Sequence, residues 1–205
     1  METPNPTVNP SSIVDILTLR YDPSINPNLP KKTWKDFEPI EEPVNLLSIE
    51  NSICNEIEKK LTDEQEISIA LSGGVDSTLI LSLLRKTKPD VKINAISIKF
   101  ANSIDETPVA SKIAEKYNAD HHIIHLENYL SELPKAISII KLPFWDLHWY
   151  YVVKKSQTMS KTLLSGDGGD ELFAGYTFRY KKFLSLTSDN SSPIEKVRAY
   201  LECHE

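Results

Sequence analysis

From residue 66 onward, the chain alternates short apolar runs with longer segments of helical period. The apolar runs cover residues 67–72 (ISIALS), 93–100 (INAISIKF), 121–126 (HHIIHL) and 162–165 (TLLS). The helical segments between them cover residues 76–86, 106–117, 129–140 and 144–159. Strands that alternate with helices are typical of a parallel sheet with helices on its faces. We therefore predict an α/β fold built on a parallel sheet.

The chain before residue 66 divides into two parts. Residues 45–60 (NLLSIENSICNEIEKK) place Leu46, Ile49, Ile53 and Ile57 on one face, which predicts an amphipathic helix. The first 45 residues are rich in proline and have no sustained apolar period, although residues 13–21 have near-helical spacing. We predict an extended arm over residues 1–45, with one short helix in it, and a folded domain over residues 46–205.

Composition narrows the class of protein. The 205 residues are 40% hydrophobic and 25% charged, with no apolar run near the roughly 20 residues of a membrane helix. The N-terminus does not resemble a secretory signal, so we expect a cytoplasmic protein without a membrane partner. The net charge of -6 disfavours nucleic acid as a partner. Cys54 and Cys203 lie far apart in sequence and are expected to be two reduced thiols.

The first candidate site is the loop Ser72-Gly73-Gly74-Val75-Asp76-Ser77, between a predicted strand and a helix. Glycines permit a tight turn, and the free amides and hydroxyls at a helix start can bind phosphate oxygens. The lysine of a common P-loop is absent, and an aspartate is present instead. A carboxylate beside a triphosphate needs a cation between them, so we interpret Asp76 as a Mg²⁺ ligand. The alternative is a simple turn in which Asp76 caps the helix.

The second candidate site is the loop over residues 165–176 (SGDGGDELFAGY), which follows the last predicted strand. Three carboxylates within five residues favour a compensating cation. Loops that follow parallel strands meet at one edge of the sheet, so Asp76 and Asp170 could share Mg²⁺. The alternatives are a solvated acidic loop or a calcium site formed without ATP.

These two loops carry a family resemblance. The string SGGVDS resembles the signature loop of the ATP pyrophosphatases, and SGDGGDELFAGY resembles the second signature of the asparagine synthetases and of β-lactam synthetase. The segment between the loops is also similar, so the resemblance covers roughly residues 40–180. It implies an adenine nucleotide α-hydrolase-like (PP-loop) fold with three layers, with ATP and Mg²⁺ as ligands.

Site residues follow from the resemblance position by position. Asp167 occupies the acidic position to which the family assigns a catalytic role, and Asp76 and Asp170 would bind the metal. The positions implied for ATP or pyrophosphate binding are Leu71, Ser72, Gly73, Gly74, Asp76, Ser77, Ile98 and Gly166.

The resemblance implies adenylation of a carboxylate, best assigned as aspartate, with release of pyrophosphate. Ammonia then attacks the adenylate to give asparagine and AMP. The alternative is a noncatalytic or partner-dependent ATP-binding subunit of a split synthetase. A third class, the tRNA-modifying pyrophosphatases, is disfavoured by the acidic charge and by the distant cysteines.

Several departures from the family qualify this expectation. Glu2 stands where the family's glutaminase domain has its nucleophilic cysteine, so we expect free ammonia or a separate glutaminase partner to supply nitrogen. The family's domain continues beyond the second signature, so we expect residues 46–205 to be incomplete at their C-terminal end, and a C-terminal subunit is a candidate partner. Ala174 stands where the family usually has glycine, and Lys99 stands where the family often has glycine.

Histidines and aromatic residues supply weaker candidates. His121 and His125 on one strand would lie about 13 Å apart, so we expect packing or surface roles for these histidines and for His122, not a metal triad. The segment PFWDLHWYYVV holds Trp145, Asp146, His148 and Trp149, which we interpret as pocket wall and candidate substrate contacts.

Overall fold

The computed structural model describes residues 9–19, 45–101, 103–140 and 146–203, and all structural statements below concern these residues. They form a parallel four-stranded sheet of order β3-β2-β1-β4. The strands are β1 (Glu66–Ala70), β2 (Lys92–Phe100), β3 (Asp120–Leu126) and β4 (Leu163–Leu164). The predicted parallel α/β sheet is therefore confirmed.

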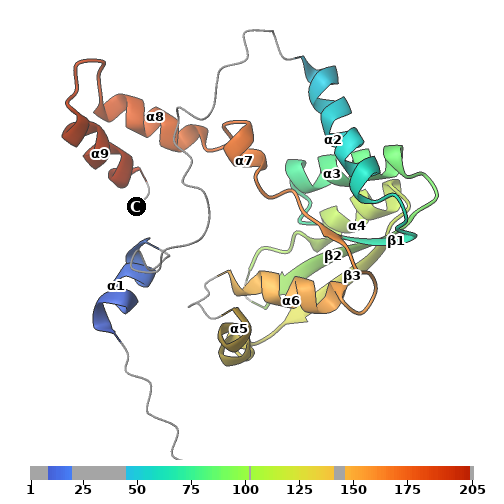
Figure 1. The fold of residues 1–205 in the computed structure, drawn as a ribbon. Helices are drawn as coiled ribbons and strands as arrows, with labels where there is room; N and C mark the ends of the chain where they lie inside the picture. Colours follow the sequence, from blue (N-terminus) through green and yellow to red (C-terminus); the bar gives the residue numbers. More distant parts are fainter. Residues whose placement is uncertain (1–8, 20–44, 102, 141–145, 204–205) are drawn as a thin grey trace, which may run out of the picture.

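Helices cover both faces of this sheet (Figure 1). On one face α3 contacts β1, α4 contacts β2 and β3, and α2 packs on α3; on the other, α6 contacts β2 and α5 packs on α6. The bounds are α2 (Leu46–Lys60), α3 (Val75–Thr87), α4 (Thr107–Lys116), α5 (Leu133–Ile140) and α6 (Leu147–Ser156). The result is three layers, with the sheet in the middle.

Burial on both faces explains why the strands are so apolar. Ile67 and Ile69 of β1 are fully buried, and so is Ser68 between them, whose hydroxyl lies 2.6 Å from that of Ser160. A central parallel strand is covered on both sides, so it has no polar face to present to water. The core therefore fixes β1, and with it the loop that follows β1.

The helix predicted over residues 45–60 begins one residue later, because Asn45 is its N-cap and its side chain accepts a hydrogen bond from Ser48 N at 2.8 Å. Ile57 is buried and Ile53 packs against the core. Leu46, however, is 87% exposed. The prediction that Leu46 belongs to the buried face is wrong, because the first turn of α2 extends past the layer formed by α3.

The predicted N-terminal arm is described only in part. A helix, α1, covers Pro10–Leu19, which confirms the short helix expected near residues 13–21. Residues 1–8 and 20–44 lie outside the described residues, so the division at residue 45 stays a prediction. Beyond the sheet, the chain continues through α7 (Gly169–Leu172), α8 (Thr177–Leu186) and α9 (Pro193–Glu202).

An ion pair fixes α6 relative to the turn before α5. Glu132 accepts hydrogen bonds from Lys154 Nζ and from Tyr150 Oη, both at 3.0 Å. The hydrogen bond from Lys154 has the largest effect, followed by that from Tyr150, and both hold the pKa of Glu132 below its ordinary value. This contact matters for the site because α6 also contributes His148 and Trp149.

We expect Glu132→Gln to reduce stability at neutral pH. A lowered folded pKa stabilises the protein above the unfolded pKa, about 4.3 for glutamate, and this contribution is lost as the pH falls through the folded pKa. The difference in urea midpoint between the wild type and Glu132→Gln should therefore close in acid. A difference that stays constant with pH would contradict the role assigned to this charge.

Candidate active site

The loop after β1 presents unpaired amides at the start of α3. Gly73 has φ +83°, a left-handed conformation that favours glycine, and Gly74 is the N-cap residue of α3. The first hydrogen bond of the helix runs from Thr78 N to Gly74 O at 3.1 Å. The amides of residues 75–77 therefore have no partner in the helix's own ladder. This arrangement can bind an anion.

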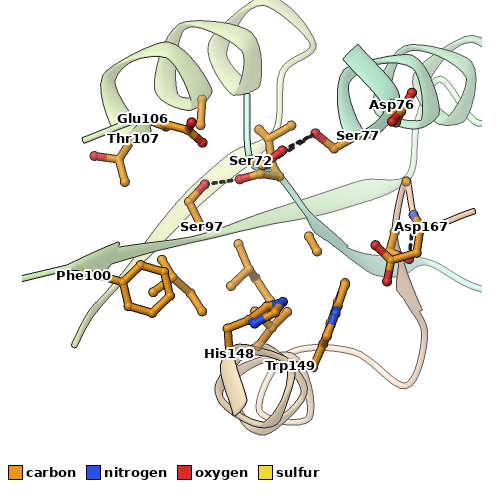
Figure 2. A pocket seen from close by; sticks show the side chains of 18 residues that line it. Ser72, Asp76, Ser77, Ser97, Phe100, Glu106, Thr107, His148, Trp149 and Asp167 are labelled. Carbon is orange, nitrogen blue, oxygen red and sulfur yellow. Dashed lines mark hydrogen bonds between the residues drawn. The ribbon is translucent and has the colours of Figure 1, made fainter. Parts of the chain in front are cut away.

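Two serine hydroxyls lie next to these amides (Figure 2). Ser72 Oγ is 3.2 Å from Ser77 Oγ and accepts a hydrogen bond from Gly74 N, also at 3.2 Å. Ser77 Oγ accepts a hydrogen bond from Ser72 N at 3.3 Å. The hydroxyls expected to bind phosphate thus lie side by side at the start of the loop.

The loop after β4 packs directly on the first loop. A Cβ atom built on Gly166 would lie 2.6 Å from Ser77 N, and one built on Gly169 would lie 2.7 Å from Asp76 Cγ. At Gly166 the approach requires glycine because the neighbouring atoms belong to the backbone, whereas at Gly169 the Asp76 side chain would have to move. The predicted meeting of the two loops at one edge of the sheet is therefore confirmed, and it occurs because β4 pairs with β1.

A cavity of about 320 Å³ lies beside this contact, and most of the expected site residues line it. Of the predicted residues, Leu71, Ser72, Asp76, Ser77, Ile98, Gly166 and Asp167 line it. Among the described residues around the cavity, Gly73, Gly74 and Asp170 are not part of its lining. The remaining lining residues are Ala70, Ile96, Ser97, Phe100, Glu106, Thr107, Ala110, His148, Trp149, Val152 and Ser165.

The cavity is rich in negative charge. Three carboxylates line it, those of Asp76, Glu106 and Asp167. Among the described lining residues, His148 alone has a side chain that can become positively charged. An anionic ligand would therefore be repelled unless a cation entered with it.

The carboxyl group of Asp167 has a raised pKa. Partial burial is the largest cause, the charge of His148 opposes it, and the negative charges of Glu171 and Asp146 add to it. A carboxyl group whose pKa is raised in a cleft is a candidate for proton transfer. Asp167 also lies on the wall opposite Phe100 and Glu106 in Figure 2, at the end of the cavity next to Asp76.

The two proposed metal ligands are both neighbours of Gly169, Asp76 through a contact and Asp170 along the chain. The Gly169 backbone lies against the Asp76 carboxylate, and Asp170 is the next residue. The Asp170 side chain lies against Gly175, where any Cβ would overlap it. In the part of the chain that the structure describes, no three His, Cys, Asp or Glu side chains form a metal cluster. Mg²⁺ held by this pair would thus need further oxygen ligands from phosphate and water, which suits its chemistry.

The two departures from the family pattern have different structural consequences. Ala174 has φ +56°, so it occupies a left-handed conformation in which glycine would be unstrained. Lys99 forms an ion pair with Asp105 at 3.5 Å, and Asp105 Oδ1 accepts hydrogen bonds from the backbone and hydroxyl of Thr107. Lys99 therefore supports the turn that leads into α4.

Several lining residues were not anticipated from the sequence, and the polar ones include Ser97, Glu106 and Thr107. Ser97 and Thr107 are buried, and Ser97 comes from the middle of an apolar strand. The available signal in the sequence was a serine within this apolar run. His148 and Trp149, interpreted as pocket wall, do line the cavity, whereas Trp145 lies outside the described residues.

The histidines of β3 and the two cysteines do not form a shared metal site in the described residues. His121 contacts Ser97 and Ser111, whereas His122 contacts Asn94, so these two rings do not meet at a metal. Cys54 and Cys203 are both free. No helix in the described segments has the length and apolar character needed to span a membrane.

Comparisons with known proteins identify relatives over most of the chain. A family model described as Asparagine synthase matches residues 49–201. Asparagine synthetase [glutamine-hydrolyzing] 1 of Bacillus subtilis is 28% identical over 174 residues, which cover 82% of this chain and 26% of that protein. A putative asparagine synthetase [glutamine-hydrolyzing] 2 of Methanocaldococcus jannaschii is 30% identical over 147 residues, which cover 69% of this chain and 28% of that protein. The chain thus spans little more than a quarter of the length of these relatives.

A solved structure shows the same fold at low identity. The glutamine-dependent NAD⁺ synthetase from Acinetobacter baumannii, in complex with ADP, has a TM-score of 0.50 and 15% identity. The match covers 68% of this chain and 29% of that chain. Together with the strand order, this likeness confirms the predicted PP-loop fold with three layers.

Proposed function

Because the chain belongs to the asparagine synthase family, we propose that its cavity binds ATP with Mg²⁺ and adenylates a carboxylate, which ammonia then converts to an amide. The best candidate for the carboxylate is the side chain of aspartate, which would give asparagine, AMP and pyrophosphate. The observation that carries the proposal is the contact of Gly166 and Gly169 with Ser77 and Asp76. It joins the free amides at the start of α3 and a carboxylate with a raised pKa in one cavity.

The binding step rests on the first loop. The free amides of residues 75–77 and the hydroxyls of Ser72 and Ser77 would donate hydrogen bonds to phosphate oxygens. Leu71, Ile98 and Gly166 would line the adenine pocket, with Gly73 and Gly74 shaping the loop. Asp76 and Asp170 would hold Mg²⁺, which when bound neutralises charge on the departing pyrophosphate.

The chemical steps balance with the residues at hand. An oxygen of the acceptor carboxylate attacks the α-phosphorus, the bond between the α-phosphorus and the bridging oxygen breaks, and pyrophosphate leaves. Ammonia then attacks the carbonyl carbon, a proton is lost from nitrogen, and AMP departs with its oxygen. Asp167 is suited to stabilise the incoming ammonium or to accept that proton, because partial burial raises its pKa.

The proposal is tested by incubating the purified chain with ATP, Mg²⁺, aspartate and ammonium. Pyrophosphate and asparagine should appear together, and both should be lost in an Asp76→Ala chain. Substituting glutamine for ammonium tests whether a separate glutaminase is needed, since amide formation should then require such a partner. If none of the carboxylates tested causes AMP to form from ATP, the proposed reaction is wrong.

A second candidate is a partner-dependent ATP-binding subunit. The observation in its favour is that, among the described lining residues, only His148 can become positively charged, so a cationic group for pyrophosphate would have to come from elsewhere. ATP binding without pyrophosphate release would support this candidate. A cytoplasmic location and the absence of nucleic acid partners remain part of the proposal in either case.

We expect Asp167→Asn to separate ATP binding from amide formation. The dissociation constant for ATP should change little, whereas asparagine formation should fall by about 100-fold or more, the usual contribution of a general acid or base. Calorimetry measures ATP binding and product analysis measures asparagine formation, both on the same preparation.

Glu171→Gln provides the matched control. It removes a carboxylate from the same loop, one whose Oε1 accepts a hydrogen bond from the Tyr176 hydroxyl at 3.1 Å. If Glu171→Gln and Asp167→Asn reduce asparagine formation equally, the effect comes from the charge of the loop, and the specific role of Asp167 is wrong.

A further inference from the structure

A chain of hydrogen bonds links α4 to the residue before the phosphate-binding loop. Ser111 Oγ lies 2.8 Å from His121 Nδ1, and His121 Nε2 lies 2.8 Å from Ser97 Oγ. Ser97 Oγ donates to the carbonyl oxygen of Leu71 at 2.5 Å (Figure 2). The chain thus begins outside the cavity and ends at two residues that line it.

The directions of these bonds follow from the donors available. A carbonyl can only accept, so Ser97 gives its single hydroxyl hydrogen to Leu71 and must accept a hydrogen from His121 Nε2. In a neutral ring Nδ1 is then an acceptor for the Ser111 hydroxyl. Burial lowers the pKa of His121, and the charge of His122 acts in the same direction, which favours this neutral ring.

The peptide between Leu71 and Ser72 is held at both ends. Its carbonyl oxygen accepts from Ser97, and its N–H donates to Ser77 Oγ at 3.3 Å. In a planar trans peptide the C=O and N–H bonds point in opposite directions, so fixing the carbonyl also fixes the direction of the Ser72 N–H. This peptide is the first one of the loop.

We propose that His121 is a positioning residue for the ATP site: through Ser97 it fixes the peptide from which the phosphate-binding loop begins. The side chains involved leave little freedom, since Ser97 is 5% exposed and Leu71 is 2% exposed. Without His121 the buried Ser97 oxygen loses its donor, and the hydroxyl can rotate away from Leu71. The effect on ATP binding rests on the proposed function, whereas the effect on the loop does not.

The neighbouring histidine supplies a matched control. His122 Nε2 lies 3.1 Å from Asn94 Oδ1, and Asn94 Nδ2 donates to Glu66 Oε1 at 2.9 Å. His122 is thus a half-buried histidine on the same strand with one hydrogen bond to β2. Its partners lie at the beginning of β1 and β2, however, and the cavity lies at the strand ends.

The experiment compares His121→Leu, His121→Gln and His122→Leu. Hydrogen exchange over residues 71–77 is measured without ligand, and ATP affinity is measured by calorimetry with Mg²⁺. His121→Leu should speed exchange at the Ser72 amide and weaken ATP binding by about fivefold to tenfold, the effect of one neutral hydrogen bond. His121→Gln should restore much of both, because its side-chain amide can donate to Ser97. His122→Leu should leave both unchanged.

The outcomes separate the two proposals. Unchanged exchange in His121→Leu, or equal changes in His122→Leu, would overturn the positioning role even if ATP binds. If the wild-type chain does not bind ATP, the proposed function fails, while the exchange data still decide whether His121 orders the loop. A nitrogen-15 spectrum that places the proton of the neutral ring on Nδ1 would also overturn the role, because Ser97 would then lack its donor.

Discussion

Replacing Asp76 by asparagine is expected to abolish the dependence of ATP binding on Mg²⁺. With Mg²⁺ present, ATP binding and any pyrophosphate release should fall by about 100-fold or more, because the proposed ligand of the metal on the triphosphate is lost. Without Mg²⁺, the same variant should bind ATP slightly better than the wild type, because one of three carboxylates in the cavity is gone. Calorimetry with and without the metal measures both effects.

Glu106→Gln distinguishes metal binding from general charge. Glu106 lines the same cavity, so this change removes the same negative charge without removing a proposed ligand. It should strengthen binding of ATP modestly whether or not Mg²⁺ is present. If Asp76→Asn behaves like Glu106→Gln in the presence of Mg²⁺, Asp76 contributes only its negative charge and is not a metal ligand. The structure does not support the alternative in which Asp76 caps the helix, because Gly74 is the N-cap of α3 and no side chain among the described residues caps it.

The second large effect is expected for Gly166→Ala. The added Cβ would lie 2.6 Å from Ser77 N and 2.7 Å from the Asp76 carbonyl carbon, and neither backbone atom can move without displacing the start of α3. Overpacking of this kind costs about 1–3 kcal/mol of stability. The second loop should separate from the first, and ATP binding should be lost even in molecules that remain folded. Thermal unfolding and calorimetry on the same samples measure the two effects.

Gly168→Asn is the control for a substitution in the same loop. Gly168 has φ +90°, and a Cβ there would meet nothing within 4 Å. Asparagine tolerates left-handed backbone better than other non-glycine residues, so it should be less strained here than they would be. ATP binding retained in Gly166→Ala, or lost equally in Gly168→Asn, would contradict the packing of the two loops.

The sequence was most informative where a pattern repeats or a motif is dense. Alternating apolar and helical segments predicted the parallel sheet, and the two glycine-rich strings predicted that their loops, with Asp76 and Asp170, would lie at one edge. The same pattern predicted that the two loops meet, but it could not give the backbone contacts that bring them so close. That closeness depends on the pairing of β4 with β1, and β4 is only two residues long.

Other features depend on tertiary contacts that local patterns do not encode. The exposure of Leu46 reflects how far α2 extends beyond α3, which periodicity does not report. The role of His121 required the positions of Ser97 on β2 and Ser111 on α4, residues that lie 24 and 10 positions away in the sequence. Asp170 was predicted to bind the metal, and its place outside the cavity lining reflects its packing against Gly175.

The contact between Ser77 and Gly166 also has a consequence for the order of folding. Its two sides are far apart in the sequence, so forming it requires a long loop to close after β1, β2 and β3 can already pair. During synthesis, a growing chain would have the glycine-rich turn after β1 well before the wall that completes the cavity. ATP that binds only the completed cavity would stabilise the last stage of folding by mass action. The nucleotide would then act as a selective stabiliser of fully folded molecules before any reaction takes place.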